Sequence, residues 1–311
     1  MPLIPLQIPA GVYRNGTDFQ GSNRWRDANL VRWVDNTMRP VRGWESRVSL
    51  GTTAPRAAIA WQDTASDRWF AAGFHDKLVV STESNVVTDI TPSNLTIGTL
   101  NAVSNVGFGG GFYGLGFYGT ARADTGNYSE ATTWSLDNFG SYLVACSTAD
   151  GRLLEWPLNT GVDAAPIANA PINNLGLLVT EERFLFALGA GGNPRKVQFS
   201  DREDNTLWTP AATNEAGDIE LQTSGQIMQG IRTRGQSLII TDVDAHSVTY
   251  IGGQFVYSFQ RVGSSCGAVS RMAAAAVDEG VFWMGQRGFF AYAGGAVQDI
   301  PCEVADHVFN D

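Results

Sequence analysis

The sequence has few residues of the types on which most catalytic and metal sites depend. It contains three histidines and three cysteines in 311 residues. The cysteines, Cys146, Cys266 and Cys302, lie far apart in the chain, so none has the CxxC spacing of a metal site. Their odd number does not fit a disulfide framework. We therefore expect no metal site and synthesis in a reducing cytoplasm.

Long apolar runs are also missing. No stretch approaches the roughly 18 apolar residues of a membrane span. The first residues, MPLIPLQIPAGVYR, carry three prolines and no basic stretch ahead of an apolar one, which does not resemble a secretory signal. Glycine is frequent, with 35 residues, and charged residues make up only 17%. These features predict a chain that folds, turns often and does not insert in a membrane.

The net charge of −10 is unevenly distributed. Residues 1–60 carry eight arginines and four acids, so this segment is positive while the rest of the chain is strongly acidic. An acidic body does not hold a phosphate backbone by counterion release, so we expect double-stranded DNA to pass it without specific binding. Arginine favours fixed, bidentate contacts. The alternative is that the N-terminal arginines make no such contacts and only keep the surface soluble.

One pattern recurs along the body: an apolar strand, a short turn rich in Gly, Asp or Asn, and a second apolar strand. Five such hairpins occupy residues 68–81, 141–156, 183–200, 237–252 and 280–294. Each has a plausible outer strand on either side, and four strands are the content of a propeller blade. Most of their spacings are near the period of about 40 to 50 residues typical of blades. We predict an all-β propeller of about five blades over residues 51–311.

The longest spacing between hairpins contains an insertion at residues 91–131. Its centre, GFGGGFYGLGFYGT, holds too much glycine for a regular strand. Gly109, Gly111 and Gly114 satisfy GxGxxG, but no strand precedes them and the aromatic rings would block a pyrophosphate, so no nucleotide site is expected. The aromatic residues are instead predicted to pack on a neighbouring subunit. They are Phe112, Tyr113, Phe117 and Tyr118.

Residues 1–50 show no hairpin pattern, and we interpret them as an extended arm that docks onto a partner. The stretch at 23–33 is compatible with a short helix or a strand. Arginine and tryptophan can anchor a protein interface. The predicted partner contacts of the arm are Arg14, Arg24, Trp25, Arg26, Arg32 and Trp33. The remaining tryptophans fit the strand pattern and are expected to fill the core, and residues 272–277 (MAAAAV) are expected to form a strand.

No set of residues forms a convincing catalytic centre. His75 and His246 are expected in hairpin turns, where a histidine is usually solvated. The DVD sequence at 242–244 lacks the glycine and terminal glutamate of a calcium loop. We therefore predict no enzymatic activity and no cofactor.

A glycosidase is the alternative, because some propellers are sialidases and glycoside hydrolysis needs two carboxyl groups. The candidates are Glu181, Glu182, Asp201, Glu203 and Asp204. Residues 147–156 and 200–208 approach the Ser-x-Asp-x-Gly-x-x-Trp turn of sialidases but depart from it in the placement or absence of the glycine. This alternative therefore depends on fold analogy alone.

Several stretches resemble the tail virion proteins of tailed bacteriophages that are known as phage stabilisation proteins, or tail nozzle and hub propellers. They run in the same order along nearly the whole chain, and the resemblance depends on their number. The matching stretches are residues 8–33, 39–44, 107–119, 133–146, 195–208, 229–253 and 259–270.

The resemblance implies a propeller-bearing component of the virion tail. Such a protein forms a ring with copies of itself, most simply a hexamer, beside adjacent tail, adaptor or portal proteins. It encloses the DNA channel and retains the genome until ejection. Members of this family are expected to continue beyond the end of this sequence, so either the protein is short or further blades lie outside it. A carbohydrate-active propeller acting on the host surface is the alternative function.

Overall fold

The computed structural model describes residues 8–43, 45–102, 130–253 and 255–309. They form five four-stranded antiparallel sheets, one two-stranded sheet, a 3-10 turn η1 (Ala190–Gly192) and a short helix α1 (Ala305–Phe309). The prediction of an all-β propeller with about five four-stranded blades is confirmed. No helix among the described residues is long and apolar enough to span a membrane.

Each blade is an up-and-down meander of four consecutive strands. The first blade contains β3 (Ala57–Gln62), β4 (Arg68–Gly73), β5 (Leu78–Thr82) and β6 (Val87–Asp89). The second contains β7 (Trp134–Phe139), β8 (Tyr142–Ser147), β9 (Leu153–Trp156) and β10 (Ala165–Pro166). The third contains β11 (Gly176–Val179), β12 (Leu185–Leu188), β13 (Lys196–Phe199) and β14 (Gly217–Glu220). The fourth contains β15 (Ile227–Thr233), β16 (Gln236–Thr241), β17 (Asp244–Tyr250) and β18 (Tyr257–Ser264). The fifth contains β19 (Ala274–Val277), β20 (Gly280–Met284), β21 (Phe289–Tyr292) and β22 (Gln298–Ile300).

The five predicted hairpins are the two middle strands of the five blades. These strands are rich in Leu, Val, Ile and Phe because neighbouring blades cover both faces of the three middle blades and one face of the first and the fifth. The pairs β8–β9 and β16–β17, for example, are buried over most of their length. The strand expected at residues 272–277 is β19.

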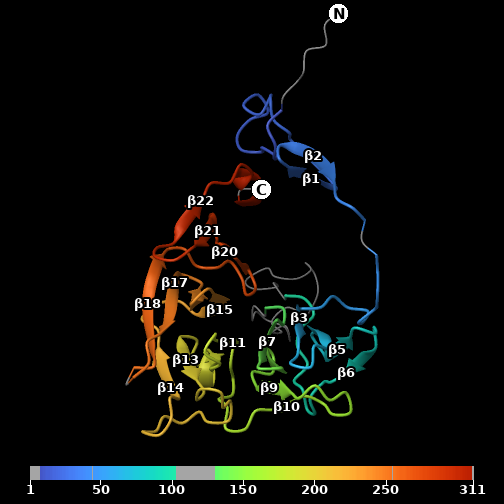
Figure 1. Ribbon diagram of the computed structural model, residues 1–311. Coiled ribbons are helices and arrows are strands. Elements are labelled where there is room, and N and C mark those ends of the chain that lie inside the picture. Colours follow the sequence, from blue (N-terminus) through green and yellow to red (C-terminus); the bar gives the residue numbers. More distant parts are fainter. Residues whose placement is uncertain (1–7, 44, 103–129, 254, 310–311) are drawn as a thin grey trace, which may run out of the picture.

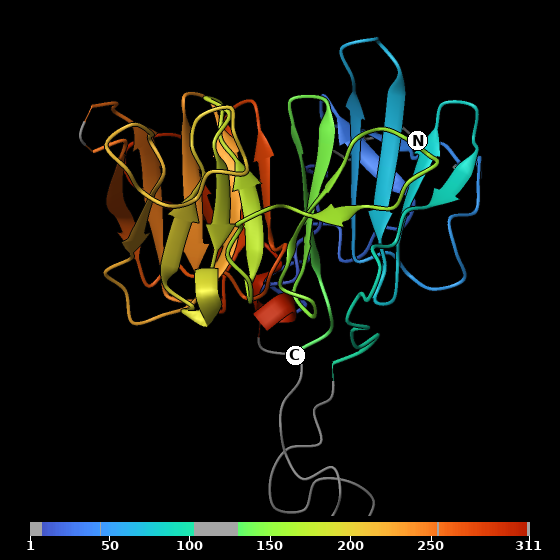
Figure 2. The same cartoon turned by 90° about the horizontal axis from the view of Figure 1, so that it is seen from below.

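The first strand of each blade is its inner strand. Strand β11 lies next to β7 and β15, β3 lies next to β7, and β19 lies next to β15. Figure 1 looks onto the blades, which are arranged in an arc around a common centre, and Figure 2 shows them edge-on with their strands side by side. The N-terminal segment and the stretch that leads from it to β3 lie on the remaining side of the circle (Figure 1).

Apolar side chains fill the four interfaces between successive blades. Trp134 and Trp156 of the second blade pack with Leu78 and Val80 of the first. Equivalent clusters join the second blade to the third, the third to the fourth and the fourth to the fifth. Four tryptophans that were expected in the core are buried, namely Trp134, Trp156, Trp208 and Trp283.

The N-terminal segment differs from the prediction, because it contains a hairpin. Strands β1 (Val31–Val34) and β2 (Thr37–Pro40) pair antiparallel. The two residues between them, Asp35 and Asn36, have φ values of 50° and 56°. Positive φ at both positions is the mark of a type I′ turn, which Asp and Asn tolerate. The alternating residues on either side of this Asp-Asn pair were the missed signal.

The expectation that His246 lies in a solvated turn is wrong. The turn ends at Asp244, where β17 begins, and His246 lies within that strand with its side chain buried. Its Nε2 atom is 3.1 Å from Oδ1 of Asp244, which also accepts hydrogen bonds from the hydroxyl groups of Thr223 and Thr241. This buried polar group stabilises the turn between β16 and β17. His75 does lie in the turn between β4 and β5.

The insertion predicted at 91–131 connects the first blade to the second. Residues 91–102 and 130–131 contain no strand. The aromatic residues Phe112, Tyr113, Phe117 and Tyr118 lie outside the described residues, so their predicted packing stays a prediction.

Candidate interaction surfaces

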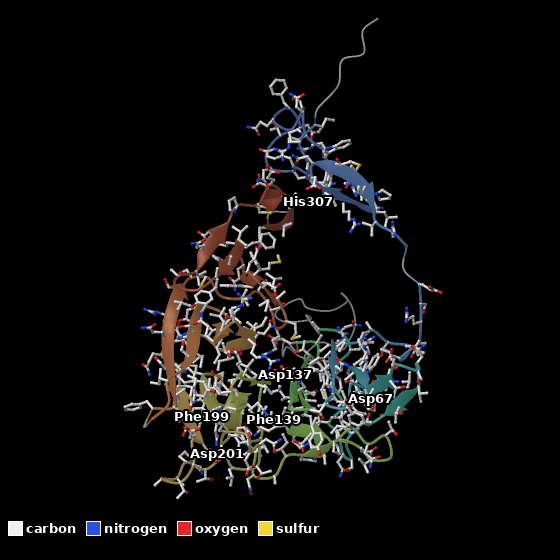
Figure 3. All side chains as sticks on the ribbon, in the orientation of Figure 1. Asp67, Asp137, Phe139, Phe199, Asp201 and His307 are labelled. Carbon is white, nitrogen blue, oxygen red and sulfur yellow. The ribbon has the colours of Figure 1, made fainter. Side chains whose placement is uncertain are left out.

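The N-terminal segment is attached to the C-terminal segment of the same chain. The backbone N–H groups of Arg14 and Asn15 donate to the carbonyl oxygen of Glu303, at 2.9 and 3.2 Å. The amide of Asn15 also donates to the carbonyl oxygen of Cys302 at 2.8 Å. Figure 3 shows His307 of α1 beside this segment. The arm predicted to be extended is therefore partly folded back onto its own chain.

Three of the arginines predicted to contact a partner have acidic neighbours within the chain. Arg24 pairs with Glu303, and Arg26 pairs with Asp18. Arg14 lies 3.6 Å from Asp27. Their charges are thus partly neutralised in the single chain, and these residues hold the segment together and fix it to the C-terminal segment.

Trp25 is half-buried and forms an isolated β-bridge with Val12. Its carbonyl oxygen accepts the N–H of Tyr13 at 2.8 Å. Trp25 therefore has a structural role inside the N-terminal segment, and a role in partner binding stays a prediction.

Arg32 differs from the other predicted arginines. It lies directly opposite Arg39 in the register of β1 and β2, and both side chains are exposed. Among the described residues, neither has an acidic partner or a hydrogen bond to its side chain. Like charges placed opposite each other destabilise a strand pair, so this arrangement favours an anionic partner. Arg42 and Arg47, which follow in the chain, are also exposed.

The other face of the hairpin is apolar. Trp33 lies opposite Met38, and Val31 lies opposite Pro40. Trp33 and Val31 are half-buried, while Met38 is 37% exposed. Each strand also pairs on one side only, because this sheet has two strands. The hairpin therefore presents a basic face, an apolar face and two free edges.

The two ends of the blades differ in charge. In every blade the first turn joins the first strand to the second, and the third turn joins the third strand to the fourth. The inner strands of all blades run in the same direction along the propeller axis, so these turns lie at one end of the propeller. Twelve carboxylates but only Arg183, Arg202 and Arg234 lie in these turns. The carboxylates are Asp63, Asp67, Glu83, Asp163, Glu181, Glu182, Asp201, Glu203, Asp204, Glu215, Asp278 and Glu279. We call this the acidic end.

The opposite end is nearly neutral among the described residues. Its turns and connections carry four acids, Asp76, Glu130, Asp150 and Asp242, and five basic residues, Lys77, Arg152, Arg195, Arg271 and Arg287. The negative charge of the body is therefore concentrated at one end, where it can attract a basic surface.

The five carboxylates considered for glycoside hydrolysis lie at the acidic end and have structural contacts. Glu181 accepts the N–H of Gly235 at 3.1 Å, and Glu182 accepts the hydroxyl of Tyr257 at 3.1 Å. Asp201 accepts two backbone N–H groups, and Asp204 accepts the N–H of Thr206. Glu203 lies 3.9 Å from Arg183. These contacts show how the carboxylates order the turns, and the glycosidase alternative is not tested by them.

Metal ligands and reactive thiols are the remaining candidates for chemistry in the described part of the chain. No group of three or more His, Cys, Asp or Glu side chains there has an arrangement that could hold a metal ion. Cys146 and Cys266 are buried, whereas Cys302 is partly exposed. Burial raises the pKa of the Cys146 thiol to about 12, which suppresses the thiolate.

Comparison with known proteins finds similar backbones at low identity. Neither a protein-family model nor a curated protein matches this chain. Solved structures with a similar backbone include virginiamycin B lyase from Staphylococcus aureus, at 8% identity and a TM-score of 0.43, over 78% of this chain and 69% of the lyase. Another is YCF48 bound to D1 peptide, at 14% identity and a TM-score of 0.43, over 85% of this chain and 70% of YCF48.

A third similar structure is a putative 6-phosphogluconolactonase from Bacteroides uniformis, at 10% identity and a TM-score of 0.42. It is matched over 85% of this chain and 87% of its own length. At these identities and TM-scores the likenesses say nothing of what this chain does.

Proposed function

We propose that this chain is a structural component of a bacteriophage tail. It assembles with copies of itself into a ring that encloses the DNA channel and retains the genome until ejection. The ring lies in the virion beside adjacent tail, adaptor or portal proteins, after synthesis in the host cytoplasm. The observation that carries this proposal is the collinear series of stretches that resemble phage stabilisation proteins.

The charge distribution supports the proposal. An acidic surface repels the DNA backbone, so DNA can pass such a body without being held. The positive charge is instead concentrated in the N-terminal segment, where Arg32 and Arg39 have no acidic neighbour among the described residues. Those two arginines suit a contact with carboxylates of another protein, because guanidinium and carboxylate groups form paired hydrogen bonds.

The experiment is to locate the chain in purified virions. An antibody raised against the purified protein should detect it by immunoblot in virions freed of lysate proteins. Gold-labelled antibody should then mark the tail or the junction of head and tail in electron micrographs. Absence of the chain from purified virions would contradict the proposal.

Point variants test the N-terminal segment more sharply than a deletion of residues 1–33 does. The deletion also removes the contact of Arg24 with Glu303, and so disturbs the C-terminal segment. Phage carrying Arg32→Glu and Arg39→Glu should instead fold normally and incorporate less of the protein into particles. Release of sugar from host polysaccharide by the purified protein, lost in Glu181→Gln, would favour the carbohydrate-active alternative.

A further inference from the structure

The exposed arginines of the β1–β2 hairpin need a counterpart outside the single chain. Arg14, Arg24 and Arg26 have acidic neighbours in their own segment or in the C-terminal segment. Arg32 and Arg39 have none among the described residues, although they lie directly opposite each other. A partner that brought carboxylates to this face would relieve the repulsion between the two guanidinium groups.

The fifth blade carries a surface with the complementary properties. Asp278 and Glu279 form the turn between β19 and β20, and both are exposed with no side-chain partner among the described residues. Val277, which precedes them, is 53% exposed, and Phe282 on β20 is 39% exposed. Carboxylates and apolar side chains therefore lie together at one edge of this blade.

This surface exists because the fifth blade is covered on one side only. Its Val281 and Trp283 face the fourth blade and are buried, whereas Phe282 points to the other face of the sheet. The inner strands β7 and β11 lie between two blades and are largely buried or half-buried. By contrast, three of the four residues of β19 are exposed.

We propose that the β1–β2 hairpin of one subunit binds the fifth blade of the next subunit. Arg32 and Arg39 pair with the second copy's carboxylates at positions 278 and 279, and the same face of the hairpin, which also carries Val34 and Thr37, covers the exposed Val277 and Phe282. This interface rests on the ring proposed above, and the hairpin and the fifth blade are the two surfaces that join neighbouring subunits of that ring.

The contact between these two surfaces is compatible with two geometries of assembly. In an isologous dimer residue i of one subunit meets residue j of the other and the reverse, so a two-fold dimer would pair the hairpin with the fifth blade twice over. A contact that pairs them once is heterologous, and it closes into a ring when the rotation between subunits permits. The opposite charges determine which two surfaces meet, and the ring proposed above corresponds to the heterologous arrangement.

The experiment compares the assembly of charge-reversed variants by sedimentation velocity at low and high salt. Arg32→Glu/Arg39→Glu and Asp278→Arg/Glu279→Arg should each weaken assembly by about tenfold or more, because like charges then face each other. The variant with all four changes should assemble again. An equimolar mixture of the two double variants should also assemble, because every surface then finds an opposite one.

The matched control is Arg261→Glu/Arg287→Glu, which makes the same change of charge at exposed arginines on the fourth and fifth blades and should assemble like the unchanged protein. Circular dichroism and thermal melting verify that each variant is folded. If a variant is unfolded, the neutral substitutions Arg32→Gln/Arg39→Gln and Asp278→Asn/Glu279→Gln replace it, and each should again weaken assembly, without recovery when the two are combined.

The outcomes distinguish a failure of this interface from a failure of the proposed function. Rings that persist unchanged in both reversed variants would overturn the interface and leave the ring. An unchanged protein that stays monomeric at all concentrations would overturn both. Loss of binding to double-stranded DNA in Arg32→Glu/Arg39→Glu, with assembly intact, would assign the hairpin to nucleic acid and overturn the interface.

Discussion

The Nη2 atom of Arg232 on β15 lies 3.0 Å from Oδ1 of Asp137 on β7, so an ion pair joins the inner strands of the fourth and second blades. The other oxygen of Asp137 accepts the N–H of Val179 on β11 at 3.1 Å. One carboxylate thereby links the inner strands of three successive blades. Figure 3 shows Asp137 toward the centre of the arc, with Asp67 and Asp201 farther out.

Loss of the guanidinium group should destabilise the propeller. Asp137 is mostly buried, so Arg232→Met leaves its carboxylate short of one charged donor, at a cost of about 1–3 kcal/mol in the free energy of unfolding. Urea denaturation at pH 7 measures this difference. Arg234→Met, at an exposed arginine two residues away without a partner in the described residues, is the control and should change the stability little. Equal stability of both variants would contradict a structural role for the ion pair.

Asp137 should also make the stability depend on pH. Burial raises the pKa of its carboxyl group above the ordinary value, although Arg232 opposes that effect. A carboxyl whose pKa is higher in the folded state destabilises the fold once it is ionised, and this cost disappears as the pH falls through the folded pKa.

The variant Asp137→Asn removes that titration. Relative to the unchanged protein, its free energy of unfolding should therefore be larger, and the variant more stable, at pH 7 than at pH 4. Denaturation curves at the two pH values give the comparison, with Asp67→Asn as an exposed control. A difference between variant and unchanged protein that does not vary with pH would show that the pKa of Asp137 is not raised.

The contact between the first and second blades leaves no room at Gly73. A Cβ atom there would lie 2.4 Å from the indole ring of Trp134, which is buried and donates to the carbonyl oxygen of Phe74 at 2.6 Å. Gly73→Ala should lower the free energy of unfolding by about 1–3 kcal/mol through overpacking. Gly288→Ala is the matched control, because no atom lies within 4 Å of its added Cβ. A melting temperature for Gly73→Ala equal to that of the control would refute the close contact.

The thiols should differ in reactivity. Burial raises the pKa of Cys146 to about 12 and that of Cys266 to about 11, whereas Cys302 is partly exposed. At pH 8 an aromatic disulfide reagent should therefore react rapidly with one thiol per native chain and with all three after denaturation. The variant Cys302→Ser should abolish the rapid phase. Rapid reaction of a second thiol in the native protein would show that a buried cysteine is accessible.

The sequence predicted the blades well because their signal is local. Each pair of middle strands is an apolar hairpin bounded by turn residues, and the flanking strands follow within a few residues. The Asp35–Asn36 hairpin was missed because its strands are short and largely exposed, so their alternation of residues is weaker than the pattern of a core strand. The position of His246 was missed because Asp244, which reads as a turn residue, begins β17 with its side chain buried.

The candidate surfaces were predictable only in part. The excess of arginine in the N-terminal segment is visible in the sequence. The sequence does not show which of those arginines have an acidic neighbour in the chain and which have none among the described residues. Arg24 meets Glu303 only because the two ends of the chain lie side by side in the fold. The exposure of Val277 and Phe282 likewise follows from the position of the fifth blade at the end of the arc, which no local pattern encodes.

The central claim is that this chain forms a ring, and electron microscopy of the purified protein in negative stain tests it most directly. The account predicts class averages with several propellers arranged around a central opening, and fewer such particles for Arg32→Glu/Arg39→Glu at the same concentration. Images that contain only single propellers, at every concentration and at low salt, would contradict it.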